Sequence, residues 1–181
     1  MKRLQIVVLL LLVSVGLTAC GLSEAETKYN SATEKLNKQD MDGALADFNE
    51  AIRLDPNLAI AYMNRGVIYA SKGEFDKAIG DETKAIELKP EKTEDQATAY
   101  SNRGTAYLAK GDLDKALADV EEAIKIKSDN AKAYLLRGSV HSGKGDTEGA
   151  ITDFKKVIEL SKDSAEGQAA QKLLDQLQPT P

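Results

Sequence analysis

The chain has no tryptophan, one histidine and one cysteine, and only 5% of its residues are aromatic. A lone cysteine cannot form an internal disulfide, and one cysteine with one histidine is too few for the usual cysteine and histidine ligand sets of zinc. Acidic residues outnumber basic ones by 29 to 24. This balance disfavours nucleic acid, whose binding depends on neutralising phosphates, and an electrostatic hold on anionic lipid. We therefore expect no enzyme, no metal site, no cofactor and no nucleic-acid partner.

The segment 1–19 has the composition of a secretory signal. Lys2 and Arg3 precede an apolar run at 4–17, and small residues follow it. A membrane-spanning helix needs about 20 apolar residues, so the run is short for a permanent span. An uncleaved signal anchor is the alternative, but we predict that residues 1–19 are removed.

The end of this segment is more specific. Leu17-Thr18-Ala19-Cys20 resembles the lipobox of bacterial lipoproteins. The resemblance implies that Cys20 becomes the first mature residue and carries a thioether-linked diacylglycerol, so that two or more fatty acyl chains such as palmitate anchor the protein. Because Gly21 is not aspartate, the resemblance permits an outer-membrane destination as well as the cell membrane. On either membrane the protein would face the periplasm or another extracytoplasmic space.

Self-comparison of the chain reveals a repeat whose period is about 34 residues and is lengthened once by four. Each unit contains two amphipathic stretches; in the second unit these are 59–71 and 75–88, separated by Lys72-Gly73 and closed by Pro90. One such helix pair cannot bury its apolar face alone, so neighbouring pairs must stack. The residues that keep the period include Ala44, Ala78, Ala116 and Ala150; Gly73, Gly111 and Gly145; and Tyr62, Tyr100 and Tyr134.

The segments Tyr62-Met63-Asn64-Arg65-Gly66 and Tyr100-Ser101-Asn102-Arg103-Gly104 resemble the first helix of tetratricopeptide repeats. The resemblance implies an all-α fold: a right-handed solenoid of about four helical hairpins plus a C-terminal capping helix. The expected segments are the signal peptide (1–19), the lipidated cysteine and a short tether (20–24), four repeats (25–58, 59–96, 97–130 and 131–164), the capping helix (165–178) and a tail (179–181).

Three features depart from the family pattern. Arginine replaces the usual leucine before the glycine, and we expect its charged head to reach water. Glu82 stands where the other units carry phenylalanine or valine. Four extra residues follow Pro90, and either they lengthen the next helix by one turn, with Thr93 and Gln96 as a capping box, or they form a longer loop.

The fold is expected to begin close to the lipid. Ser23 and Glu26 have the spacing of a capping box, which leaves about three tether residues after Cys20. At about 3.5 Å per residue this tether spans on the order of 10 Å, so the stack would sit against the membrane.

Two features with catalytic associations are explained by the repeat. The segment 138–145 nearly matches the phosphate-binding loop GxxxxGK[ST], but Gly145 stands where the loop needs a hydroxyl and no strand precedes it. His141 occupies a tyrosine position of the repeat, so a packing role is expected. We predict no nucleotide site.

Stacked first helices of this family form a concave groove that binds extended peptides in some members. Asparagines at two matching positions could pair with a ligand's backbone through their amides, or they could only tie neighbouring helices together. The clamp that binds a C-terminal carboxylate needs several basic residues, and only Asn102 and Lys132 match it, so that function is not carried over. The candidate groove residues are Asn64, Asn102, Met63, Val67, Ser101, Lys132 and Leu135.

The leading hypothesis is a membrane-anchored adaptor or scaffold that binds an extended or helical segment of an unidentified envelope protein. The alternative is a self-associating structural envelope protein with no dedicated peptide site.

Overall fold

The computed structural model describes residues 22–177, so the signal segment, Cys20 and residues 178–181 lie outside the described part. Every regular element of that part is a helix, which confirms the all-α prediction. None of these helices is both long and apolar enough to cross a membrane. The helices are α1 (Glu24–Asn37), α2 (Met41–Leu54), α3 (Ala59–Ser71), α4 (Phe75–Glu87), α5 (Thr93–Ala109), α6 (Leu113–Ile126), α7 (Ala131–Gly143), α8 (Thr147–Ser161) and α9 (Ala165–Leu177).

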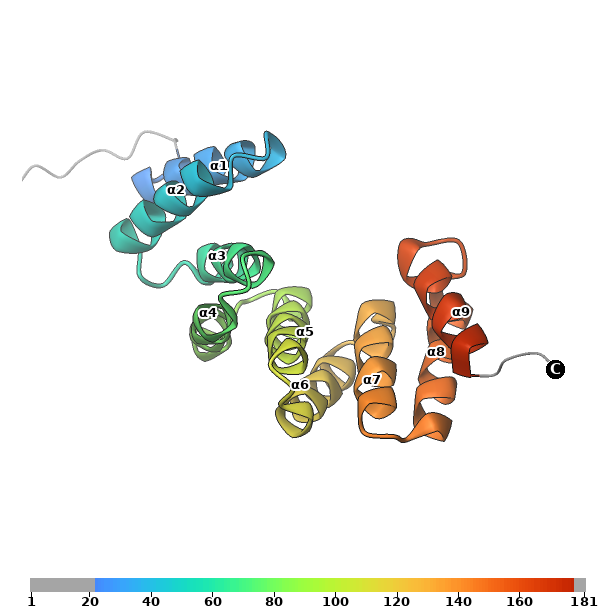
Figure 1. Ribbon diagram of the computed structural model, residues 1–181. Coiled ribbons are helices and arrows are strands. Elements are labelled where there is room, and N and C mark those ends of the chain that lie inside the picture. The colour runs from blue at the N-terminus through green and yellow to red at the C-terminus, as the bar shows by residue number, and fades with distance from the viewer. Residues whose placement is uncertain (1–21, 178–181) are drawn as a thin grey trace, which may run out of the picture.

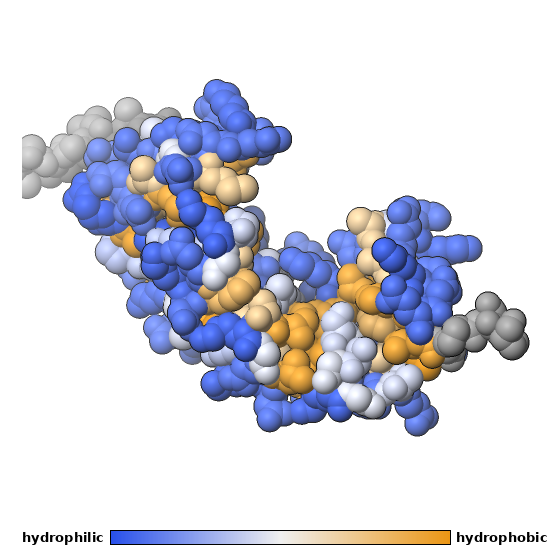
Figure 2. All heavy atoms as spheres, in the orientation of Figure 1, coloured by the Kyte–Doolittle hydropathy of each residue, from blue (hydrophilic) through white to orange (hydrophobic). Residues whose placement is uncertain are grey.

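Consecutive helices pack as four pairs, α1 with α2 through α7 with α8, and α9 packs on α8. Figure 1 shows the pairs stacked into an arch, with α3, α5 and α7 toward its inner side and α4, α6 and α8 toward its outer side. Each inner helix also contacts the next one, α3 with α5, α5 with α7 and α7 with α9. The space-filling view in Figure 2 shows that the arch is hollowed between its two arms. The first helices therefore line a concave face, as expected for a solenoid.

Glycine makes the tight turn inside three of the four pairs. Gly73, Gly111 and Gly145 have φ angles of 76° to 79°, a left-handed conformation that suits a residue without Cβ. In the first pair Gln39 occupies the same place with φ of 63°. The first unit therefore makes the same turn with a residue that is strained in it.

Small residues let the two helices of a pair approach closely. Ala44, Ala78, Ala116 and Ala150 are all essentially inaccessible to solvent. The buried apolar side chains form separate clusters along the stack. The cluster between the second and third pairs has only Met63, Ala85 and Ala99 at its centre. That junction therefore has the least apolar material of the stack.

The four extra residues lengthen a helix. α5 has 17 residues, whereas α3 and α7 each have 13. The predicted capping box at Thr93 is wrong: Lys92 is the N-cap without a side-chain cap, and Gln96 donates to the Pro90 carbonyl instead. Gln96 thus reaches back past the helix N-terminus, but to a carbonyl before the N-cap and not to the backbone N–H of the N-cap residue.

The predicted capping box at the start of the fold is confirmed. Ser23 Oγ accepts from the Glu26 backbone N–H at 3.1 Å, and the Ser23 N–H donates to Glu26 Oε2 at 2.7 Å. This hydrogen bonding lowers the pKa of Glu26. The first helix thus has a defined beginning, at Glu24.

Candidate functional site

The exposed part of the concave face is largely uncharged. Val67 on α3 is 49% exposed, Lys132 on α7 is exposed and Leu135 is partly buried. The hydroxyls of Thr105 and Ser139 donate to carbonyls one turn earlier in their own helices, which leaves them less free to donate to a ligand. The surface offered to a ligand therefore combines aliphatic side chains, hydroxyls and one lysine.

Two of the predicted groove residues lie inside the stack. Met63 is 3% exposed and Ser101 is 1% exposed. Met63 packs with Ala85 and Ala99 between the second and third pairs. Both face a neighbouring helix and not the hollow, so direct contact with a ligand, as the sequence suggested, is corrected to a role inside the stack.

Both predicted asparagines are bonded to neighbouring helices. Asn64 Nδ2 donates to the Tyr29 hydroxyl on α1 at 3.0 Å. Asn102 Nδ2 donates to Glu82 Oε1 on α4 at 3.0 Å, and Lys132 Nζ on α7 donates to Asn102 Oδ1 at 3.5 Å. The helix-tying role left open by the sequence is therefore present, and it uses one of the two Nδ2 N–H donors of each amide.

Glu82 is a buried acid at the junction with the smallest apolar cluster. It is 1% exposed, and its Oε2 is buried without a hydrogen-bond partner among residues 22–177. Burial raises the pKa of Glu82 to about 8; Asp81 adds to the rise, whereas Asn102, Lys132 and Arg103 oppose it. A carboxyl so held keeps its proton at neutral pH, where exposed glutamates are charged.

The arginines before the repeat glycines do not extend into water, contrary to the prediction. Each donates Nε and Nη2 to one buried aspartate of the partner helix, with N–O distances of 2.6 to 2.9 Å. Each guanidinium also lies 5.3 to 5.6 Å from the centre of a tyrosine ring. This paired geometry satisfies charges that would be costly to bury alone. The sets are Arg65, Asp81 and Tyr62; Arg103, Asp119 and Tyr100; and Arg137, Asp153 and Tyr134.

The segment that resembles a phosphate-binding loop is mostly helical. Residues 138–143 belong to α7, so their backbone N–H groups are committed to the helix. His141 Nδ1 lies 2.8 Å from Oδ2 of Asp146, the N-cap of α8. This histidine joins the two helices of its pair.

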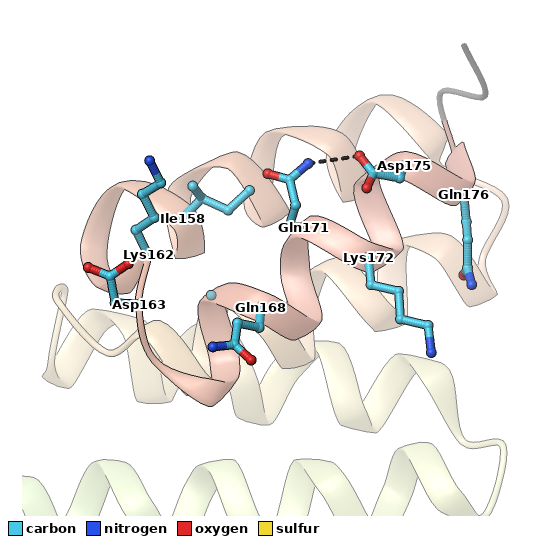
Figure 3. Close-up of a pocket in the computed structure, with 9 residues that line it drawn as sticks. Ile158, Lys162, Asp163, Gln168, Gln171, Lys172, Asp175 and Gln176 are labelled. Atoms are coloured by element: carbon cyan, nitrogen blue, oxygen red, sulfur yellow. Dashed lines mark hydrogen bonds between the residues drawn. The ribbon is translucent and has the colours of Figure 1, made fainter.

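A pocket of about 610 Å³ lies between α8 and α9 (Figure 3). α9 begins at Ala165 and α7 at Ala131, one repeat period apart, so α9 occupies the place of a first helix in a further unit. Gln171 and Lys172 stand where the earlier units carry arginine and glycine, and Gln171 donates to Asp175. The residues that line the pocket are mostly polar or charged, but their apolar atoms form most of its surface. α9 packs on α8 and is the last helix of residues 22–177.

Comparison with known proteins gives consistent matches. Family models described as "Tetratricopeptide repeat" match residues 57–129 and 101–169, and one described as "TPR repeat" matches residues 34–73. Among curated proteins, the heat shock protein sti1 homolog of Schizosaccharomyces pombe is 40% identical over 68 residues, which are 38% of this chain and 11% of that protein. Hsp70-Hsp90 organizing protein 2 of Arabidopsis thaliana is 35% identical over 68 residues, again 38% and 11% of the two chains. The chain thus matches only a small part of these relatives' length.

Solved structures share the fold over a larger part of the chain. The MamA protein aligns with a TM-score of 0.70 at 23% identity, covering 85% of this chain and 82% of that one. The first TPR of Spaghetti (RPAP3), bound to the HSP90 peptide SRMEEVD, aligns with a TM-score of 0.59 at 26% identity, covering 66% and 90%.

Proposed function

The described part of the chain is a stack of tetratricopeptide repeats, and on that basis we propose that the protein is a membrane-anchored, extracytoplasmic adaptor that binds a partner's segment in its concave groove. The observation that carries the proposal is the hollow, largely uncharged face built by α3, α5 and α7. The signal segment and the lipobox at Cys20 support the anchoring and the location. The partner is an unidentified envelope protein, and the membrane lipid is reached through acylated Cys20.

The groove favours a neutral, apolar segment, extended or helical. Val67 and Leu135 offer aliphatic surface, and Lys132 is the one cation in the predicted groove set. An acidic tail such as the SRMEEVD peptide bound by the RPAP3 repeat would leave its carboxylates without enough basic partners. The proposed partner segment therefore carries aliphatic side chains on the face that enters the groove.

Capture from gently solubilised membranes tests this proposal. The wild-type protein is compared with Val67→Asp and with Lys132→Glu, each of which places a negative charge on the exposed inner face. Lys155→Glu on α8 is the matched control, because Lys155 is exposed on the outer helix layer and makes no ion pair within the described residues. The copurifying proteins are identified by mass spectrometry.

A partner that is retained by the wild type and by Lys155→Glu, and lost from both groove variants, supports the adaptor. Equal recovery from all four proteins would place the contact outside the groove. An inventory that contains only further copies of this chain would favour the self-associating alternative. Mass spectrometry of the purified protein tests the anchor, since the wild type should carry the added mass of acyl chains on Cys20 and a Cys20→Ala variant should not.

A further inference from the structure

A chain of polar groups runs from the core of the stack to its concave surface. It begins at the buried carboxyl of Glu82 on α4, passes through the amide of Asn102 on α5 and ends at the exposed ammonium of Lys132 on α7. It therefore links three of the four pairs at the junction with the least apolar material.

The arrangement is particular to this junction. At the position of Glu82 the other units carry Phe48, Val120 and Phe154, all buried and apolar. Asn64, one unit earlier than Asn102, is bonded to a tyrosine hydroxyl instead of a carboxyl. The repeat pattern thus does not require an acid here, and packing alone would favour an apolar side chain.

We propose that Glu82 is a positioning residue of the groove: its carboxyl holds the side-chain amide of Asn102 so that Oδ1, and not Nδ2, is turned toward the ammonium of Lys132. The ammonium of Lys132 can only donate, so it requires Oδ1 to face it, and Oε1 of the carboxyl accepts from Nδ2 on the other side of the amide. The other charges near Glu82 are held in place. Asp81 is paired with Arg65 of α3, and Arg103 of α5 is paired with Asp119 of α6.

This orientation predicts which chemical group of a partner the groove binds at the third unit. That prediction rests on the proposed function. An acceptor, Asn102 Oδ1, stands beside a donor, Lys132 Nζ. A peptide group has the complementary pair, an N–H for Oδ1 and a C=O for the ammonium. A backbone peptide group at this place is what the family resemblance implies for Asn102, and the orientation held by Glu82 makes that group complementary to Oδ1 and to Lys132.

The orientation is tested by NMR of the isotope-labelled protein, without any partner. The side-chain NH₂ signals of Asn102 are followed from pH 6 to pH 9.5, with those of Asn64 as the internal control. Because a hydrogen bond to a charged acceptor is stronger, the Asn102 signals should shift with a midpoint near the pKa of Glu82, about 8, and those of Asn64 should not follow that midpoint. In Glu82→Gln, which keeps an acceptor oxygen, this shift should vanish.

The Glu82 carboxyl signal is followed in the same titration, and Asn102 signals that do not change at its midpoint, or that shift in the same way in Glu82→Gln, would overturn the assignment. The wild-type titration decides by itself if the variant fails to fold. Asn102 signals that follow Glu82 in a protein that captures no partner would leave the positioning role standing and refute the adaptor. A partner captured through the groove, together with Asn102 signals that do not depend on Glu82, would support the adaptor and refute the positioning role.

The ligand class is tested with N-methylacetamide, which carries one peptide group. N,N-dimethylacetamide is the matched control because it lacks the N–H. The first should perturb the Asn102 signals more than the second at equal concentration, and Lys132→Met should reduce the difference. Equal perturbation by the two amides would refute the peptide-group assignment.

Discussion

The buried carboxyl of Glu82 predicts that the protein loses stability as the pH rises. Burial raises the pKa of this group from 4.5 to about 8 in the folded chain. Between these values the folded state binds a proton that the unfolded state has released, so the free energy of unfolding falls with increasing pH. The stabilisation is fully present below pH 4.5 and is lost as the pH passes 8.

The magnitude follows from the width of this window. One pKa unit corresponds to about 1.4 kcal/mol, so the folded protein should lose about 3 kcal/mol between pH 5.5 and pH 9. For a chain of this size, that loss lowers Tm by roughly 6–12 °C. Exposed carboxyls are already ionised at pH 5.5, so they contribute little over this range.

Thermal and urea unfolding of the wild type and Glu82→Gln across this pH range provides the assay. The glutamine cannot titrate, and every other ionisable group is present in both proteins, so the difference between the two curves isolates Glu82. The stability of the variant relative to the wild type should rise by about 3 kcal/mol from pH 5.5 to pH 9. Parallel curves would refute the reasoning, because they would mean that Glu82 ionises as an exposed acid does.

Four further substitutions should change stability in predictable directions, each measured by urea unfolding. Gln39→Gly should stabilise by about 0.5–1 kcal/mol, because Gln39 holds φ at 63°; a destabilised variant would contradict this. Glu74→Asp should add a side-chain cap to α4 and stabilise by about 0.5–1 kcal/mol, and an unchanged stability would mean that the cap does not form. Gly80→Ala should stabilise by about 1 kcal/mol, since open space surrounds it, whereas Gly138→Ala should destabilise because its Cβ would lie 2.6 Å from the Phe154 ring; equal effects would argue against this packing.

The stacked helix pairs were predictable because several kinds of residue recur with the same period. Gly73, Gly111 and Gly145 each mark a turn, and alanines at the same spacing mark the close contacts. The pairing of the arginines with buried aspartates was not predicted, although the sequence carries a signal for it: an aspartate follows each of the three arginines at the same separation along the chain. A guanidinium considered without a partner is predicted to lie in water, whereas one with a carboxylate on the facing helix can be buried.

The groove itself was harder to predict than the fold. A repeat pattern assigns residues to a helix face, but it does not say how closely the next helix covers that face. Met63 and Ser101 were placed on the groove, yet the neighbouring pair covers them. Val67 and Lys132 stayed exposed, as a groove residue must. The bond from Asn102 to Glu82 joins a residue that matches the repeat pattern to one that departs from it, and the sequence showed the two only separately.

Helix α9 also bears on how such an array could be lengthened. Because α9 begins one repeat period after α7, its backbone lies where the first helix of a further module would lie. Its surface differs from that of α3, α5 and α7, since Gln171 and Lys172 stand in place of an arginine and a glycine. A longer groove could therefore be engineered by inserting a whole module before α9, which keeps α9 packed against a second helix as it is now.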